Sequence, residues 1–225
     1  MKKILIISLV ILVFLLIIYY LIDLNPSSKS DFKINGIDIS HYNKVYDWNK
    51  VKNHSKFCII KASEGGSRKD PMFNHYWVES KNHKIVRGAY HFFTPGVPAI
   101  KQFLNFKNQV KLYSGDLPPI LDVELKECDM NEVNKWLELA EQYYQVKPII
   151  YSDYLFFKVF MERKVNKCPL WLYFNGKYKV KPSFNNFDCV FWQYNQQGRV
   201  NGLIGDTDLD TFLGDLESFN SILIK

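Results

Sequence analysis

The feature that most constrains the fold is an alternation, from residue 35 onward, between apolar segments of strand length and segments with helical periodicity. Alternating strands and helices favour a parallel α/β sheet, and eight strands suggest that the sheet closes into a barrel. Strands are predicted at residues 36–40, 57–63, 86–92, 119–124, 148–152, 170–174, 190–194 and 207–211. Helices are predicted between them at residues 48–54, 73–83, 99–110, 131–145 and 154–165.

The last three predicted strands depart from this pattern because no proper helix lies between them. Residues 176–186 contain Gly, Pro and Asn, and residues 198–205 contain three glycines, so both stretches are typical of loops. We therefore expect a TIM-like α/β barrel in which five helical crossovers are followed by a plainer final portion.

Residues 4–22 form an uncharged and almost wholly apolar stretch that only Ser8 interrupts. A helix of this length spans a bilayer core of about 30 Å, whereas a signal peptide has about 7–15 apolar residues and a small-residue cleavage site. Residues 21–25 offer no such site. We therefore expect residues 1–23 to be a membrane anchor rather than a cleaved signal, residues 24–34 to be a linker and residues 35–225 to be the barrel.

The basic N-terminus, Lys2-Lys3, favours a cytoplasmic position for that end of the chain. The barrel would then lie on the extracytoplasmic side of the cell membrane as part of a single-pass protein. Secretion or a periplasmic location after signal cleavage is the alternative.

The net charge of +6 and the pI of about 8.9 favour an anionic partner. No run of Lys and Arg is long enough to bind nucleic acid as a stripe, so we expect a wall polymer or phospholipid head groups instead. The four cysteines show no disulfide framework and no metal-ligand spacing. Cys58 and Cys189 fall in apolar strand segments, where a thiol packs as a small hydrophobe. We expect neither a metal nor a cofactor.

Two carboxyl groups stand together on the predicted fourth strand. Because side chains alternate along a strand, Asp122 and Glu124 share a face with Ile120, at the carboxyl end where parallel barrels place their active sites. Carboxyl groups this close do not ionise independently, so one pKa is raised. A protonated acid beside an ionised carboxylate is what the cleavage of a glycosidic bond requires.

Other predicted strands direct further acids to the same end. Asp38 and Ser40 share one face of the first strand, and Asp206, Asp208 and Asp210 share one face of the last. Closure of the barrel would bring these acids together with the pair on the fourth strand.

The same alternation selects aromatic residues for the mouth of the barrel. Tyr90 and Tyr151 are expected there, with either Trp171 or Tyr173 from the sixth strand. The seventh strand supplies either Trp192 and Tyr194 or Gln193, because a slip of one residue exchanges the two faces.

Short motifs along residues 35–213 resemble, in order, those of glycoside hydrolase family 25, the Chalaropsis-type lysozymes. Asn43, Asp210 and the sixth strand depart from that pattern, which affects saccharide subsites and stem-peptide preference more than catalysis. The matching residues are Gly36-Ile37-Asp38-Ile39-Ser40-His41, Asp47-Trp48, Ile60-Lys61-Ala62-Ser63-Glu64-Gly65, Asp70-Pro71, Gly88-Ala89-Tyr90-His91-Phe92, Leu121-Asp122-Val123-Glu124, Trp192-Gln193-Tyr194, Gly202 and Asp208-Leu209.

The resemblance implies a (β/α)5β3 barrel and muramidase activity on the β-1,4 bond between N-acetylmuramic acid and N-acetylglucosamine of peptidoglycan. It implies Glu124 as the proton donor and Asp122 as the second catalytic residue. In one route, which we favour, Asp122 orients the substrate's own acetamido group as the nucleophile, and the configuration is retained. In the other, an Asp across the cleft activates a water molecule and the configuration is inverted, which requires the two carboxyl groups to lie about 6.5–9.5 Å apart. The expected substrate-binding residues are Asp38, Asp208, Tyr90, Tyr151, Trp171, Trp192 and Gln193.

The leading interpretation is an active, monomeric muramidase that contacts peptidoglycan glycan strands and is held on the cytoplasmic membrane through residues 4–22. A non-catalytic wall-binding module is the first alternative, although the intact set Asp38, Asp122, Glu124 and Asp208 argues against it. A hydrolase of another N-acetylated glycan, such as chitin, is the second.

Overall fold

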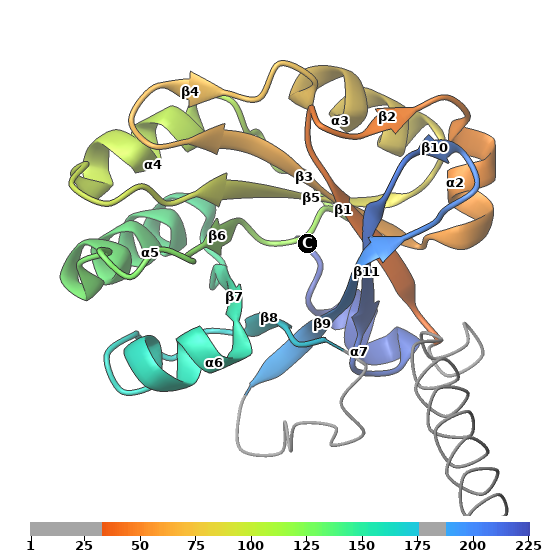
Figure 1. Cartoon of the computed structure of the whole chain (residues 1–225). Coiled ribbons are helices and arrows are strands. Elements are labelled where there is room, and N and C mark those ends of the chain that lie inside the picture. Colours follow the sequence, from red (N-terminus) through yellow and green to blue (C-terminus); the bar gives the residue numbers. More distant parts are fainter. Residues whose placement is uncertain (1–32, 176–187) are drawn as a thin grey trace, which may run out of the picture.

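The computed structural model describes residues 33–175 and 188–225, in which eight strands close into a barrel (Figure 1). Neighbouring strands are parallel from β1 to β9, whereas β11 is antiparallel to both β9 and β1. In order around the barrel they are β1 (Asn35–Ile39), β3 (Phe57–Glu64), β5 (Val86–Phe92), β6 (Ile120–Asp122), β7 (Ile149–Asp153), β8 (Leu170–Tyr173), β9 (Cys189–Gly198) and β11 (Thr207–Phe212).

The helices that connect the first six of these strands lie on the outside of the ring (Figure 1). Asp47 caps α2, because its carboxylate accepts from the backbone N–H groups of Asn49 and Lys50 at the start of the helix. The helices are α2 (Trp48–His54), α3 (Phe73–Asn82), α4 (Ala99–Lys107), α5 (Met130–Tyr144) and α6 (Tyr154–Phe156), which continues as the π-helical turn η2 (Phe157–Met161).

Four short elements were not predicted from the sequence. The two-residue strands β2 (Lys44–Val45) and β10 (Leu203–Ile204) pair with each other, and β4 (Arg68–Lys69) folds back on the end of β3. The helix α7 (Leu216–Ser221) follows the last strand. The eight predicted strands and five predicted helical segments are all present, although the segment predicted at 154–165 already ends at Met161.

The expectation of a parallel sheet is wrong at the last strand. Residues 199–206 join β9 to β11 without a helix, and a parallel crossover needs a dozen or more residues. The connection therefore turns the chain back on itself, and β11 enters the barrel antiparallel to its neighbours.

The predicted anchor at residues 4–22 lies outside the described residues, as does most of the predicted linker at 24–34. Within residues 33–175 and 188–225 there is no helix of the length and apolar character that a membrane crossing requires.

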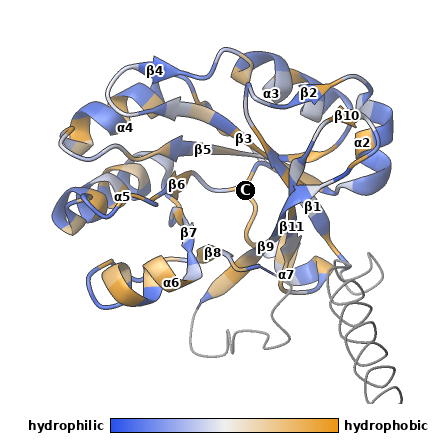
Figure 2. Cartoon of the chain, in the orientation of Figure 1, coloured by the Kyte–Doolittle hydropathy of each residue, from blue (hydrophilic) through white to orange (hydrophobic). Residues whose placement is uncertain are grey.

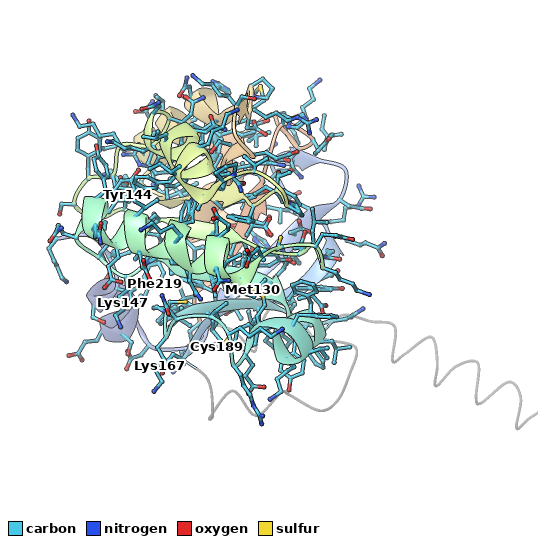
Figure 3. All side chains as sticks on the ribbon, turned by 90° about the vertical axis from the view of Figure 1, so that its left-hand side faces the viewer. Met130, Tyr144, Lys147, Lys167, Cys189 and Phe219 are labelled. Carbon is cyan, nitrogen blue, oxygen red and sulfur yellow. The ribbon has the colours of Figure 1, made fainter. Side chains whose placement is uncertain are left out.

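Alternating side chains give the strands two separate cores. Phe57, Ile120 and Phe191 point into the barrel, whereas Leu121 belongs to an outer layer between the strands and the helices, which also contains Trp136 of α5. The helices carry hydrophobic and hydrophilic residues side by side, as Figure 2 shows. In Figure 3, α5 runs along the outside of the barrel between the labelled residues Met130 and Tyr144 at its two ends.

The amino-terminal end of the barrel is filled by apolar side chains. Phe219 of α7 packs there against Phe57, Phe191 and Phe212, with ring centroids 5.9, 6.4 and 5.2 Å away. The backbone of Ile224 then pairs with that of Gly115 and Asp116. Polar side chains of the barrel interior consequently gather at the opposite end, where the parallel strands finish.

All four cysteines are free. Cys58 is buried, as expected for its apolar strand, and Cys128 and Cys168 are buried as well. Cys189 is only partly buried.

A buried ion pair joins β5 to the loop before β6. The Arg87 Nε donates to Asp116 Oδ1 at 2.7 Å and its Nη2 donates to Oδ2 at 3.1 Å. The Arg87 Nη1 also donates to the Trp77 carbonyl, and the guanidinium lies 4.0 Å from the Trp77 ring centroid. Removing either partner of such a pair leaves a buried charge without compensation.

We predict that Asp116→Ala lowers the free energy of unfolding by about 3–5 kcal/mol, because Arg87 stays buried without its partner. Urea unfolding followed by circular dichroism measures the change. The control Glu141→Ala, at an exposed position of α5, should stay within about 0.5 kcal/mol of the wild type. A loss below about 1 kcal/mol for Asp116→Ala would show that the pair contributes little to stability.

Candidate active site

A cavity of about 250 Å³ opens where the parallel strands end. Its walls contain eight of the nine predicted site residues: Asp38, Asp122, Glu124, Asp208, Tyr90, Tyr151, Trp171 and Gln193. Five further residues also line it: Ser40, Tyr42, Lys61, Phe92 and Gln196.

The position of the central acids follows from β6 and the residues just beyond it. Ile120 and Asp122 face the barrel interior, as predicted, while Leu121 and Val123 pack in the outer layer. Backbone hydrogen bonds continue past the strand, from Val123 N–H to the Tyr151 carbonyl at 3.0 Å. The Ser152 hydroxyl donates to the Val123 carbonyl at 2.8 Å. Glu124 therefore projects from a fixed backbone at the mouth of the cavity.

Burial and mutual repulsion raise the pKa values of these carboxyl groups. The pKa of Asp122 is raised well above its ordinary value by loss of hydration and then by repulsion from Glu124. The pKa of Glu124 is raised by partial loss of hydration and then by the nearby Asp153. Burial, followed by repulsion from Asp38, raises the pKa of Asp208 to about 8. The cavity therefore holds protonated carboxyl groups near neutral pH.

Lys61 is the only cationic side chain among the described residues that line this cavity. Its ammonium group lies 2.9 Å from Glu64 Oε2 and 4.9 Å from the centroid of the Phe92 ring. Its charge opposes the rise in pKa of both Asp122 and Glu124. The single charge of Lys61 does not balance four carboxylates. The remaining repulsion is relieved when some of these carboxyl groups bind a proton.

A chain of hydrogen bonds crosses the floor of the cavity. The Tyr151 hydroxyl donates to Gln193 Oε1 at 2.7 Å, and Gln193 Nε2 donates to Asp38 Oδ2 at 2.6 Å. On the other side, the Trp171 indole N–H donates to Asp210 Oδ1 at 2.9 Å. These bonds fix the orientation of five buried side chains beneath Asp122 and Glu124.

Asp38 and Asp210 close this chain, because their carboxyl groups lie within hydrogen-bonding reach of each other. Asp210 is fully buried, and its Oδ2 has no N–H or hydroxyl donor among the described residues. Burial, and then the nearby carboxyl groups, raise the pKa of both acids. Two carboxyl groups in contact share a proton rather than ionise together, so Asp38 and Asp210 act as one proton-sharing pair.

Trp192 does not line the cavity, which corrects its expected position at the mouth. Its side chain belongs to the outer core, where its indole N–H donates to the Phe174 carbonyl at 2.8 Å. Gln193 points inward instead, so the register left open by the sequence is resolved in favour of Gln193. Asp206 also departs from its expected place, because it precedes β11 and pairs with Arg199 at 2.9 Å.

Sequence reasoning had passed over Lys61, Tyr42 and Gln196. Lys61 stands on β3 at a position whose inward orientation alternation could have indicated, opposite Tyr90 in the register with β5. Tyr42 and Gln196 lie where loop geometry and a strand irregularity decide the side-chain direction, and no local pattern gives those. No group of three or more potential metal ligands occurs within residues 33–175 and 188–225.

A closed α/β barrel that gathers partly protonated carboxyl groups at the carboxyl ends of its strands has the architecture of a barrel glycosidase. Residues 37–203 match the family described as Glycosyl hydrolases family 25, and the chain belongs to that family.

Relatives and solved structures agree with this assignment. YegX of Escherichia coli K12, an uncharacterised protein, is 32% identical over 205 residues, which span 86% of this chain and 75% of that protein. Lysozyme M1 of Streptomyces globisporus is 28% identical over 200 residues, or 80% of this chain and 68% of the relative. A family 25 glycosyl hydrolase from Bacillus anthracis superposes with a TM-score of 0.78 at 27% identity, covering 87% of this chain and 96% of that one.

We predict that Asp210→Asn reduces the loss of stability with rising pH. The folded protein holds a proton on the Asp38–Asp210 pair that the unfolded chain releases above the ordinary pKa of 3.8. Stability of the wild type therefore falls as pH rises from about 4 toward the raised pKa. The substituted amide can donate to Asp38 and accept from Trp171 at every pH.

Unfolding at pH 4 and at pH 8 measures this effect. The difference in unfolding free energy between the two pH values should be smaller in Asp210→Asn by at least about 1 kcal/mol, the equivalent of most of one pKa unit. Identical pH dependence in the two proteins would contradict the shared proton.

Proposed function

We propose that the protein is an N-acetylmuramidase that cleaves the β-1,4 bond between N-acetylmuramic acid and N-acetylglucosamine in peptidoglycan. The observation that carries this proposal is the pairing of Glu124, at the mouth with a raised pKa, with the buried Asp122 beside it. Family membership supports it, as do the relatives Lysozyme M1 and the N,O-diacetylmuramidase of Arthroderma benhamiae.

Glu124 is suited to the role of general acid. It stands at the solvent-accessible mouth, and partial loss of hydration together with the nearby Asp153 raises its pKa, which favours the protonated form that a general acid needs. A glycosidic oxygen placed above it would receive this proton as the bond to the sugar breaks. Return of the proton from water would then restore the acid.

Asp122 is suited to orient the substrate. Its Oδ1 is buried and has no hydrogen-bond donor among the described residues, so it can accept from an N–H group of a bound sugar. The 2-acetamido N–H of the sugar is such a donor. A hydrogen bond there would turn the acetamido oxygen toward the anomeric carbon, which favours its attack as internal nucleophile and retention of configuration.

An inverting route would use Asp208 or Asp38 across the cavity to activate water. We propose the acetamido route because burial and repulsion raise the pKa of both acids, that of Asp208 to about 8, and a protonated carboxyl is a poor base. Proton NMR of the first anomer released distinguishes the two routes: a β product indicates retention and an α product indicates inversion.

We also propose that residues 4–22 anchor the enzyme as a transmembrane helix ahead of a (β/α)5β3 barrel. β1 begins at the closed, amino-terminal end of the barrel, opposite the cavity. An anchor ahead of residue 33 would therefore direct the mouth away from the membrane and toward the wall.

Fractionation of cells that express the full chain tests the anchor. The protein should remain in the membrane pellet through high-salt and carbonate washes and be released by detergent. Recovery of a shortened protein from the medium or periplasm would instead show signal cleavage.

We predict that Glu124→Gln abolishes turnover while the fold and glycan binding are retained, because the amide cannot donate the proton. Asp122→Asn should lower the rate about 10²-fold or more, since its amide replaces the acceptor by a donor. The control Glu127→Gln, an exposed acid three residues farther along the same loop, should keep wild-type activity.

The measurement is muropeptide analysis of purified peptidoglycan digested by residues 31–225 and by each variant. New reducing ends at N-acetylmuramic acid, absent with Glu124→Gln, are the expected result. Unimpaired Glu124→Gln would overturn the mechanism. A folded wild type that cleaves neither peptidoglycan nor chitin would support the alternative of a non-catalytic wall-binding module. A wild type that cleaves chitin but not peptidoglycan would support the alternative of a hydrolase of another N-acetylated glycan.

A further inference from the structure

A second cavity, of about 310 Å³, adjoins the acidic one. The two share Tyr42 and Lys61, so they form branches of one cleft with these side chains at the junction. The second branch is built by the loop after β1 and by the β3–β4 hairpin, which presents Arg68 and Lys69.

The two branches differ in charge. Four carboxyl groups and one lysine line the acidic branch, whereas Lys61, Arg68 and Lys69 line the second against the acids Glu64 and Asp70. The second branch is therefore the more favourable place for a negatively charged substituent.

Neither acid of the second branch is free to repel an anion. Asp70 has a fully buried side chain, and it accepts from the backbone N–H and Nδ1 of His41 and from the N–H of Met72. Glu64 is bound by Lys61 at 2.9 Å and by Arg68 at 2.6 Å. Positive charge is consequently left over at this end of the cleft.

The exposed cations offer free donors. The Arg68 side chain is 79% exposed, so guanidinium N–H groups beyond the Nη1 bound to Glu64 face solvent. Lys69 is exposed as well and has no ion-pair partner within the described part of the chain. An arginine beside a lysine can bind a carboxylate through charge-assisted hydrogen bonds.

The β3–β4 hairpin, which carries these cations, is held in place by α4. The buried Asn105 of α4 donates through its Nδ2 to the carbonyls of Gly65 and Arg68, each at 3.0 Å. Gly65 adopts a φ of +54°, which this tight turn requires. Arg68 and Lys69 are therefore presented on a fixed backbone, which lowers the entropic penalty of binding a ligand.

We propose that the second branch is the subsite for the acidic stem peptide carried by the lactyl group of muramic acid. The proposal rests on the muramidase function, because it needs a wall glycan in the acidic branch. With the sugar above Asp122 and Glu124, the peptide leaves the glycan across Tyr42, and its carboxylates meet Arg68 and Lys69. The enzyme thus selects peptide-bearing glycan over bare glycan.

The test uses Arg68→Gln/Lys69→Gln, which removes both exposed cations without adding charge. The matched control is Lys52→Gln/Lys56→Gln, two exposed lysines at the closed end of the barrel. Each protein is assayed on three substrates: peptidoglycan freed of teichoic acid, the same glycan stripped of its peptides by an amidase, and wall that retains teichoic acid.

The wild type should cleave the peptide-bearing glycan with a kcat/KM about tenfold above that for the stripped glycan. The double variant should lose this preference, with unchanged kcat/KM on stripped glycan, while the control keeps it. An equal effect on both substrates, or none, would overturn the proposal. A loss confined to wall with teichoic acid would identify phosphate as the anion and overturn it too. Failure of the wild type on all three would instead refute the muramidase function.

Discussion

The gathering of carboxyl groups at one end of a closed barrel is the constraint on which the site depends. Asp38, Asp122, Asp208 and Asp210 lie on three strands and Glu124 just beyond β6, close enough for repulsion between carboxyl groups to raise pKa values in this group. The protein tolerates this concentration because protons, donors from Gln193 and Trp171, and the charge of Lys61 compensate for it. Repulsion between neighbouring carboxyl groups therefore raises their pKa values and favours the protonated form that a general acid needs.

The other half of the barrel makes such crowding possible. Its amino-terminal end is filled by aromatic and branched side chains and closed by Phe219 of α7. Burial of this apolar surface is the dominant favourable contribution to folding. The outer core between strands and helices adds a second apolar layer. The polar floor is therefore supported on both sides by packing that does not depend on its protonation.

Alternation along single strands predicted much of this arrangement. It placed Asp122, Glu124 and Asp38 on inward faces because period-two patterns depend only on local sequence. It left Trp192 and Gln193 undecided, since a one-residue shift exchanges the faces and only pairing with β8 and β11 fixes the register. The β3–β4 hairpin depends on loop closure, so no local pattern indicates it. The antiparallel β11 follows from the short, helix-free connection at residues 199–206, a signal that the sequence contained but that the alternation of strands and helices did not use.

The four free thiols have a consequence for how the protein matures. Burial raises the pKa of the thiols of Cys128 to about 11 and of Cys168 and Cys189 to about 12, and that of Cys58 well above its ordinary value. The thiolate, which is the form that oxidants and disulfides attack, is therefore scarce in the folded state. The final structure of the barrel contains no disulfide bond, so its formation requires no oxidation of these thiols.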